Sequence, residues 1–329
     1  MKRNRSDKTI IFFLGMTVFL ILLCFCFRIH ALGEEKDINP PEIKVEITDA
    51  GKEFTSNVRK ATIIITDDKM KGEIKKEYVF KEGKDSFHIS IKDAAGNESI
   101  YRSDVYVQDY TAPLEKTEGI SDGQIINEEL DVRIFAIEEW LDEEKSFVTI
   151  TGQNSYDEYK YFFEENNISI YDDGSFKDDC YSMRIFLSDK AGNTCERNID
   201  FTINRDGSLF EVDKRNKEII GSVTDDIKDF YILEKNLSRV DTDNARILFA
   251  FNARAVDLKI GRDYRIEEKK DADGYTYTYI FHDELFKKDG IYTISLSTRD
   301  EAGNVNDTRL SKESDEIRFA VKKRLRLQK

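Results

Sequence analysis

The sequence predicts an all-β protein made of three tandem antiparallel β-sandwich domains that follow an N-terminal apolar segment. The first observation is a five-residue phrase, Asp-x-Ala-Gly-Asn, which occurs three times, at residues 93–97, 189–193 and 300–304. The second is that each copy ends a run of alternating apolar and polar residues. The third is the spacing between copies, about 100 residues, which is the usual length of one sandwich.

Each copy of the phrase closes a predicted half-buried strand. Side chains at a period of two share one face of a strand, so apolar residues at that period are expected to face a core. Phe186 breaks the alternation and is expected to point outward or to cover a neighbouring domain. The positions two, four and six before each Asp are Ile91, Ile89 and Phe87; Leu187, Ile185 and Met183; Thr298, Leu296 and Ile294.

The phrase itself is predicted to be a tight turn that leads into a second strand. Glycine accepts a positive φ easily, asparagine tolerates it next best, and aspartate can accept hydrogen bonds from the backbone just after it. The predicted structural turn residues are Asp93, Gly96, Asn97, Asp189, Gly192, Asn193, Asp300, Gly303 and Asn304.

A tyrosine corner is predicted in two of the three domains. Tyr181 and Tyr292 stand eight residues before the Asp of the second and third copies, at the start of the penultimate strand. In a tyrosine corner the ring enters the core and the hydroxyl bonds the backbone. The first copy has Asp85 at this position, so the first domain is expected to be shorter or less stable.

The predicted domains are residues 42–110, 111–204 and 205–321, after a linker at 34–41 and before a basic tail at 322–329. Proline is excluded from central strands, so Pro113 marks the first junction, and Gly207 marks the second. Strands are expected at 43–47, 61–66, 78–80, 87–92 and 101–107 in the first domain and at 130–137 and 146–151 in the second, with one helical turn at 138–144. The third domain should contain a hairpin with strands 264–268 and 275–281 and a turn at 271–274.

The N-terminal 33 residues are predicted to be a signal peptide or a signal anchor. Basic residues precede an apolar run at 10–27, and the small residues Ala31 and Gly33 follow it. This order is typical of a secretory signal, and the run also reaches the lower limit for spanning a bilayer. Membrane contact through residues 10–27 is therefore expected if the segment is retained, and the rest of the chain is expected outside the membrane.

The net charge and the cysteines indicate which partners and which disulfide are not expected. The net charge is −14, which disfavours nucleic acid because an acidic surface repels phosphate. Outside the apolar run only Cys180 and Cys195 remain. A hairpin about the second turn would pair Cys195 near Ser188 and Cys180 near Ile203, which separates the sulfurs by about 25 Å and predicts no disulfide between them.

The sequence predicts that the protein is not an enzyme and has no cofactor. It contains three histidines, at His30, His88 and His282, and none belongs to a catalytic motif. No metal site is predicted with a complete ligand pattern. Asp271 and Asp273 could give oxygen ligands to calcium, but Asp-Gly pairs are also ordinary hairpin turns.

Aromatic residues offer two candidate ligand contacts. Tyr275, Tyr277 and Tyr279 share one face of a predicted strand and could stack on sugars if that face is exposed, or fill a core if it is not. Trp140, the only tryptophan, lies in an acidic segment. It is expected either to anchor its own loop or to contact a ligand.

Taken together, the repeated phrase after an alternating strand resembles the bacterial Ig-like repeats of Gram-positive, clostridial-type exported and cell-surface proteins. The third domain carries the closest match, through residues 204–210, 275–280 and 289–293. The resemblance implies an extracytoplasmic array, secreted or membrane-anchored, with a spacer or adhesion role. No Leu-Pro-x-Thr-Gly sorting signal occurs in the sequence.

The leading function hypothesis is a non-catalytic surface module that acts as spacer or adhesion domain and binds a protein or a glycan at the cell surface. Two alternatives stay open. One is a carbohydrate-binding accessory module of an extracellular glycan-processing system, and the other is a surface rod made rigid by calcium.

Overall fold

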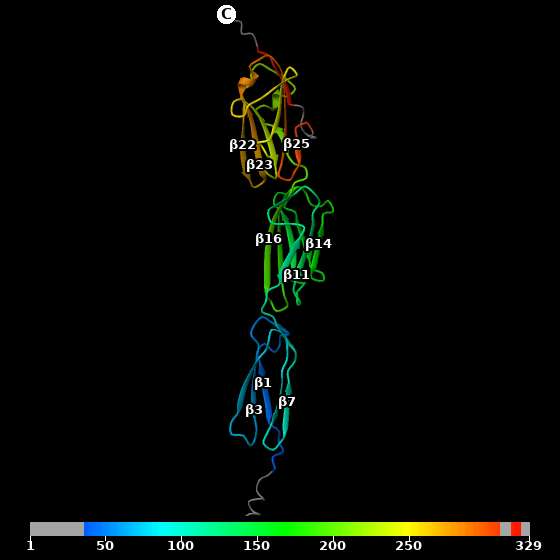
Figure 1. The fold of residues 1–329 in the computed structure, drawn as a ribbon, viewed down its shortest axis with the longest axis vertical. Coiled ribbons are helices and arrows are strands. Elements are labelled where there is room, and N and C mark those ends of the chain that lie inside the picture. Colours follow the sequence, from blue (N-terminus) through cyan, green and yellow to red (C-terminus); the bar gives the residue numbers. More distant parts are fainter. Residues whose placement is uncertain (1–35, 310–316, 324–329) are drawn as a thin grey trace, which may run out of the picture. The chain divides into compact units, whose positions relative to one another are not determined.

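The computed structural model describes residues 36–309 and 317–323. This part of the chain consists of strands, turns and two short 3-10 helices, which confirms the all-β prediction (Figure 1). The chain divides into two compact units, with the boundary between Tyr110 and Thr111. The first unit holds one hydrophobic core, and the second unit holds two.

The first unit is a small sandwich of short sheets. One sheet has the order β1 (Glu42–Ile47), β3 (Lys60–Thr66) and β4 (Ile74–Val79). The others are β2 (Phe54–Thr55), β8 (Tyr106–Gln108) and β5 (Gly83–Asp85), and the pair β6 (His88–Lys92) and β7 (Glu98–Arg102). Alternate residues of β3 face the core, where Ala61, Ile63 and Ile65 are buried beside Phe80.

The second sandwich, which begins the second unit, has an Ig-like layout of three strands packed on five. The smaller sheet is β14 (Asn167–Tyr171), β11 (Asp131–Ile137) and β9 (Leu114–Glu118). The larger sheet is β10 (Gln124–Ile126), β16 (Thr194–Ile203), β15 (Asp179–Ser188), β12 (Phe147–Gly152) and β13 (Glu158–Phe162). All these pairs are antiparallel except β10 with β16.

The third sandwich has two larger sheets. The first is β17 (Leu209–Val212), β19 (Phe230–Asn236), β23 (Gly274–Phe281) and β22 (Tyr264–Asp271). The second is β18 (Val223–Thr224), β26 (Ile317–Val321), β24 (Gly290–Arg299), β20 (Arg246–Phe251) and β21 (Arg254–Val256), with β25 (Val305–Asp307) beside β24. The 3-10 helices are Lys217–Ile219 and Asp283–Phe286.

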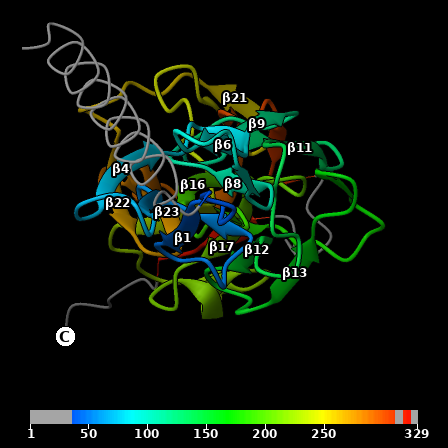
Figure 2. The ribbon, with the colours of Figure 1, turned by 90° about the horizontal axis from the view of Figure 1, so that it is seen from below.

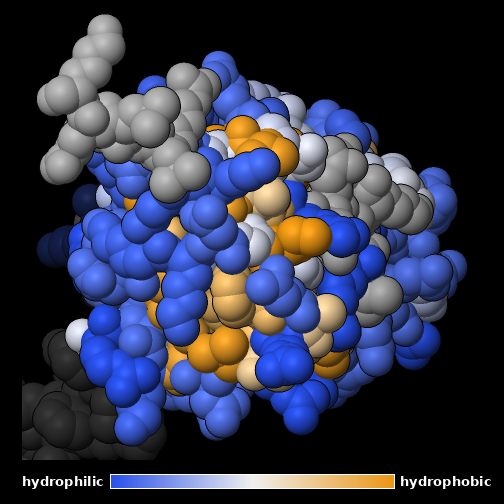
Figure 3. All heavy atoms as spheres, turned by 90° about the horizontal axis from the view of Figure 1, so that it is seen from above, coloured by the Kyte–Doolittle hydropathy of each residue, from blue (hydrophilic) through white to orange (hydrophobic). Residues whose placement is uncertain are grey.

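In the strands before the second and third repeated turns, the apolar residues of the sequence pattern are the buried ones. Met183, Ile185 and Leu187 of β15 are buried in the second core, and Ile294 and Leu296 of β24 in the third. Figure 3 looks onto one end of the third sandwich, where apolar residues gather within a hydrophilic surround.

Three local expectations were wrong. Residues 101–107 are not one strand, because β7 ends at Arg102 and β8 starts at Tyr106. Residues 138–144 contain bends and turns instead of a helical turn. The hairpin register differs by one residue from the expected one, since Cys195 pairs with Leu187 and Cys180 with Thr202. Both cysteines are free thiols at opposite ends of the β15–β16 hairpin.

The predicted signal or anchor at residues 1–33, with its apolar run at 10–27, lies outside the described residues, as do residues 324–329 of the basic tail. Over the described ranges, the structure has no helix with the length and apolar character needed to cross a membrane.

Candidate binding groove in the second unit

The three copies of the repeated phrase adopt the same turn. In each, the Asn backbone N–H and the Asn side-chain amide both donate to the carboxylate of the Asp four residues earlier, at 2.7–3.1 Å. The glycine before each Asn has a φ between 92° and 95°, a conformation that side chains other than glycine disfavour. The repeat is therefore a turn locked by its own Asp and Asn.

In two copies the Asn also holds the segment that leads into its own sandwich. The side-chain amide nitrogen of Asn97 lies 3.3 Å from the carbonyl oxygens of Asp37 and Asn39. That of Asn304 lies 2.8 Å from the carbonyl oxygen of Asn204. These residues precede the first strand of the first and third sandwiches, so the repeated turn secures the start of the domain to its end.

The two predicted tyrosines have the geometry of a tyrosine corner. The Tyr181 hydroxyl donates to the carbonyl oxygen of Lys177 at 2.9 Å, and the Tyr292 hydroxyl to that of Lys288 at 2.8 Å. Both rings are buried, and burial raises the pKa of Tyr181 to about 12.

The first sandwich fills the same position with a carboxylate. Asp85 accepts a hydrogen bond from the backbone N–H of Lys81, four residues earlier, at 2.8 Å. It also accepts one from the Tyr78 hydroxyl at 2.8 Å. In the tyrosine corners the side chain donates to a carbonyl oxygen four residues earlier, whereas the Asp85 side chain accepts from a backbone N–H four residues earlier. The aromatic ring at this place in the first sandwich comes from Tyr78.

A buried polar network joins the segment between the second and third sandwiches to the third core. The side-chain amide nitrogen of Asn204 lies 2.8 Å from Asn236 Oδ1, 2.9 Å from Ser238 Oγ and 3.2 Å from Asp300 Oδ2. Asn236 Nδ2 in turn donates to Asp300 Oδ2 at 3.0 Å and to Ser208 Oγ at 2.7 Å. Sequence reasoning missed this set because its members are far apart along the chain.

The network ends on Glu234, a buried carboxyl on β19. It accepts hydrogen bonds from the hydroxyls of Ser208 at 2.7 Å, Thr298 at 2.5 Å and Tyr279 at 2.6 Å. Burial raises the pKa of Glu234 above its ordinary value, and the three hydroxyl donors oppose that shift in part. The folded state therefore holds the Glu234 proton more tightly than the unfolded chain does.

The raised pKa of Glu234 predicts a pH-dependent stability for the third sandwich. Its stabilising contribution is fully present below the ordinary pKa of 4.5 and is lost as the pH rises through the folded-state pKa. Glu234→Gln should therefore gain stability relative to the unchanged protein as the pH rises above 4.5. Hydrogen exchange of β19 amides measures this, with exposed Glu267→Gln on β22 as the control. A constant difference across that pH range would contradict the prediction.

A second set of contacts secures the other side of the same segment. Arg205 Nη2 makes an ion pair with Asp172, and Nη1 donates to the carbonyl oxygen of Phe176 at 2.9 Å. The backbone N–H groups of Arg205 and Asp206 both donate to Asp178 Oδ2 at 2.7 Å. Residues 204–206 are thus held by the third sandwich through Asn204 and by the second through Arg205.

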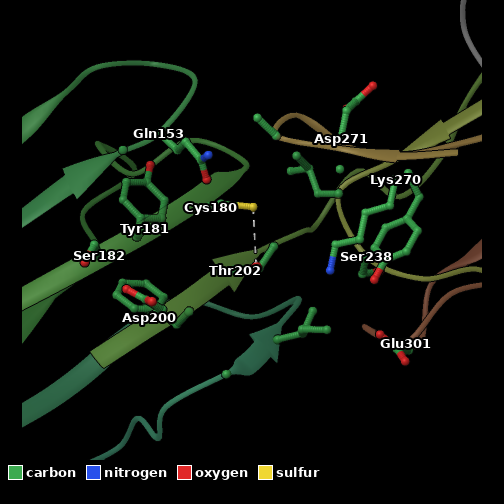
Figure 4. A pocket seen from close by; sticks show the side chains of 18 of the residues that line it. Gln153, Cys180, Tyr181, Ser182, Asp200, Thr202, Ser238, Lys270, Asp271 and Glu301 are labelled. Atoms are coloured by element: carbon green, nitrogen blue, oxygen red, sulfur yellow. Dashed lines mark hydrogen bonds between the residues drawn. The ribbon is translucent and has the colours of Figure 1, made fainter. Parts of the chain in front are cut away.

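Beside this segment lies a groove of about 600 Å³, lined by both sandwiches of the unit (Figure 4). The second sandwich contributes residues 151–153, 180–182 and 200–202, at one end of its five-stranded sheet. The third contributes the β22–β23 hairpin, together with Ser238 and Glu301.

In the wall from the second sandwich, a buried aspartate fixes the backbone of the loop after β12. Asp179 accepts hydrogen bonds from the backbone N–H groups of Asn154 at 3.0 Å and Ser155 at 2.8 Å. Next to it, the Thr202 hydroxyl lies 3.6 Å from the Cys180 sulfur, as Figure 4 shows. Burial raises the pKa of the Cys180 thiol, so it stays protonated at neutral pH and is a poor nucleophile.

The wall from the third sandwich is the hairpin predicted from the sequence. The half-buried Tyr275 lines the groove, and the ammonium of Lys270 lies 5.0 Å from the centre of its ring. Asp271 also lines the groove and accepts a hydrogen bond from Lys269 at 3.1 Å. The groove thus sets an aromatic ring beside groups of both charges.

The other aromatic candidates lie elsewhere. Tyr277 and Tyr279 are fully buried, so of the two expected roles they have the one in the core and they are not ligand contacts. They alternate with Thr276 and Thr278 on β23, and their face of the sheet packs inward. Half-buried Trp140 accepts a hydrogen bond from the Lys190 N–H at 2.9 Å, near the repeated turn at the far end of β15 from the groove.

Carboxylates gather elsewhere than at the predicted calcium ligands. Asp271 accepts a hydrogen bond from the N–H of Asp273 at 3.2 Å, which is ordinary turn chemistry, and no third carboxylate joins them among the described residues. In the first unit, Asp37, Asp67 and Asp93 bring carboxylate oxygens within 4.8 Å of one another. Three such oxygens could serve a hard cation, which takes six to eight in the case of calcium.

No protein-family model matches the sequence, and no curated protein does. The chain is similar to a solved complex of Dpr2 Ig1–Ig2 with DIP-Theta Ig1–Ig3, at 8% identity and a TM-score of 0.41, covering 82% of this chain and 97% of that chain. It is also similar to the ICAM-5 D1–D4 ectodomain fragment, at 8% identity and a TM-score of 0.32, covering 86% and 77%. A third similar structure is Escherichia coli alpha-2-macroglobulin, at 9% identity and a TM-score of 0.26, covering 86% and 33%.

Proposed function

We propose that this chain is a non-catalytic Ig-like repeat protein, displayed outside the membrane of a bacterial cell, which acts as a spacer or adhesion module and binds a protein or a glycan. The observation that carries the proposal is the fixed segment at residues 204–206. Asn204 is bonded into the third sandwich and Arg205 into the second. Modules joined by a flexible linker reorient freely, whereas a hydrogen-bonded joint transmits distance and direction.

The extracytoplasmic location is supported by the sequence. A basic flank, an apolar run at residues 10–27 and two small residues form the order of an export signal. The resemblance of the repeated phrase to bacterial surface Ig-like repeats agrees with that order.

Location can be tested directly on the native cell. Intact cells are treated with a protease that does not enter them, and the membrane and medium fractions are analysed by N-terminal sequencing. We expect the protein to be cleaved on intact cells, or to occur in the medium with an N-terminus near Glu34. A full-length protein that becomes sensitive only after lysis would overturn the proposed location.

The alternative role as a carbohydrate-binding accessory module is favoured by the groove. Sugar sites in proteins are concave and combine an aromatic surface with a few polar groups that fix orientation. Tyr275 supplies such a ring, and Gln153, Asp200 and Lys270 supply amide, carboxylate and ammonium groups around the groove.

Tyr275→Ala tests the glycan role. If a glycan packs on the Tyr275 ring, the variant should bind it at least tenfold more weakly, which corresponds to about 1.4 kcal/mol. A glycan array of bacterial wall and host sugars identifies the ligand, and titration calorimetry measures the dissociation constant. Tyr171→Ala, at an exposed tyrosine on the other sheet of the second sandwich, is the matched control. Equal losses in both variants, or no ligand on the array, would count against the glycan role.

A further inference from the structure

A row of three phenylalanines crosses the outer face of the five-stranded sheet in the second sandwich. Phe147 on β12 is paired in register with Phe162 on β13 and with Phe186 on β15. Phe162 is 56% exposed, and the other two rings are half-buried. This row includes Phe186, which broke the alternation in the sequence, and it accounts for the outward direction of that ring.

Two cations lie among these rings. The ammonium of Lys160 is 4.6 Å from the centre of the Phe147 ring and 5.2 Å from that of Phe162. The guanidinium carbon of Arg184 is 5.7 Å from the centres of both Phe147 and Phe186. The rings of Phe147 and Phe186 stack on each other at 5.3 Å.

The ring geometry favours a peptide over a sugar. On this row, the Phe147 ring stacks on that of Phe186, and the ammonium of Lys160 lies over the rings of Phe147 and Phe162. The surface therefore offers ring edges and a positive charge to a partner, and the edges of an aromatic ring carry its positive partial charge. This surface therefore suits aliphatic groups and carboxylates.

The row reaches a free edge of the sheet. Among the strands of the described residues, β13 is the last in its sheet and pairs with β12 alone, and Figure 2 shows the two strands side by side. An edge strand presents backbone N–H and C=O groups that can pair with an added strand. On β13 the outward residues are Glu158, Lys160 and Phe162, while Tyr159 and Tyr161 pack toward the core.

Charge identifies the partner. Arg184 is neutralised by a two-bond ion pair with Glu196, at 2.8 and 3.0 Å. Lys160 has no carboxylate at ion-pair distance within residues 36–309 and 317–323, although many lysines of this acidic chain do. An acidic group on an added strand would complete this site, and the cation is already held in place by two rings.

We propose that β13 is a docking edge for an extended, acidic peptide segment of a partner protein, which joins the sheet as a sixth strand. On an antiparallel added strand, the residue opposite Phe162 is apolar, the residue opposite Lys160 is Asp or Glu, and the residues opposite Tyr159 and Tyr161 are apolar. The inference rests on the proposed role as a binding protein but not on the groove, which lies at the other end of this sheet.

The test uses the full chain and three synthetic eleven-residue peptides. The first contains the central run valine-valine-glutamate-valine-threonine, the second has lysine in place of the glutamate, and the third has proline after the glutamate. Two-dimensional NMR of the isotopically labelled protein gives the dissociation constants and the residues that respond. We expect the glutamate peptide to bind at least tenfold more tightly than the other two, with the largest shifts in β13.

Charge exchange gives the decisive comparison. Lys160→Glu should reverse the preference, so that the lysine peptide binds more tightly than the glutamate peptide. The matched control is Lys116→Glu on β9, which is also an edge strand and also places a lysine over a phenylalanine, with Lys116 Nζ 5.9 Å from the Phe135 ring centre. Lys116 is already paired with Glu118 at 2.6 Å, so this variant should keep the original preference.

Several outcomes would overturn the proposal. One is equal binding of the acidic and basic peptides, and another is binding that persists in Lys160→Glu. Absence of shifts in β13 with all three peptides would also reject it. Loss of glycan binding in Phe162→Ser would assign the row to a sugar, and self-association abolished by the same variant would assign it to a second copy of this chain. Tyr275→Ala should leave peptide binding unchanged, so failure at the groove and failure at β13 remain distinguishable.

Discussion

Asp300→Ala is expected to destabilise the third sandwich by about 3–5 kcal/mol. The Asp300 carboxylate is 5% exposed and accepts hydrogen bonds from the backbone and side chain of Asn304. It also accepts hydrogen bonds from the side chains of Asn204 and Asn236. Alanine would leave these donors buried without their acceptor, and an unsatisfied buried donor is more destabilising than the loss of an exposed hydrogen bond.

The same substitution in the first sandwich is the natural control. Asp93 occupies the equivalent turn and is only half-buried, and its side chain accepts hydrogen bonds from Asn97 at 2.8 and 2.7 Å. Asp93→Ala should therefore destabilise its sandwich much less than Asp300→Ala destabilises the third. Hydrogen exchange of β24 amides for Asp300→Ala and of β6 amides for Asp93→Ala measures each sandwich separately. If both variants lose the same unfolding free energy, the hydrogen bonds within the turn account for the loss and the buried network around Asp300 adds nothing.

The fold was accessible from the sequence because its signals are local. A period of two in Met183, Ile185 and Leu187 requires only that one face of a strand be buried, and the turn after them is bonded within five residues. The same logic identified the hairpin of β22 and β23, whose turn includes Gly274. At the repeated turn and at this hairpin, residues close in sequence determine the conformation, and the pattern predicted it.

Register and the buried network were not accessible in this way. The register of β15 with β16 depends on the exact conformation of the turn, and a shift of one residue leaves the composition of both strands unchanged. Strand alternation places Glu234 on the same face as Phe230 and Ile232, but the sequence does not show which groups satisfy its carboxylate there. These groups are Ser208 just before β17, Tyr279 of β23 and Thr298 of β24, and only the folded structure brings them to Glu234.

The groove shows the same limit. Tyr275, Tyr277 and Tyr279 are equivalent in the sequence because they share one face of β23. Their exposure differs because of their distance from the end of the strand. Tyr275 lies next to the turn and lines the groove, whereas Tyr277 and Tyr279 lie deeper in the sandwich and are buried. A sequence pattern gives the face of a side chain but not its distance from the end of the core.

Gly274→Ala is expected to destabilise the third sandwich by about 3–5 kcal/mol and to open the wall of the groove. Gly274 begins β23 with a φ of 113°, a conformation that an alanine side chain strongly disfavours. A Cβ at this position would also lie 2.5 Å from the carbonyl oxygen of Asn236 and 3.0 Å from Leu237 Cα. Both obstacles are backbone atoms, so they cannot move aside as a flexible side chain would.

Gly221→Ala separates the two contributions. Gly221 is in the same sandwich and has a φ of 71°, but a Cβ there would meet nothing within 4 Å. This variant suffers the conformational penalty alone, about 1–2 kcal/mol. Chemical denaturation measures the loss of unfolding free energy in each variant. If the two losses are equal, a movement of the hairpin relieves the close approach of the new Cβ at position 274 to Asn236. In that case ligand binding at Tyr275 should weaken in Gly274→Ala while the sandwich stays folded, because the ring is carried by the residue next to the displaced turn.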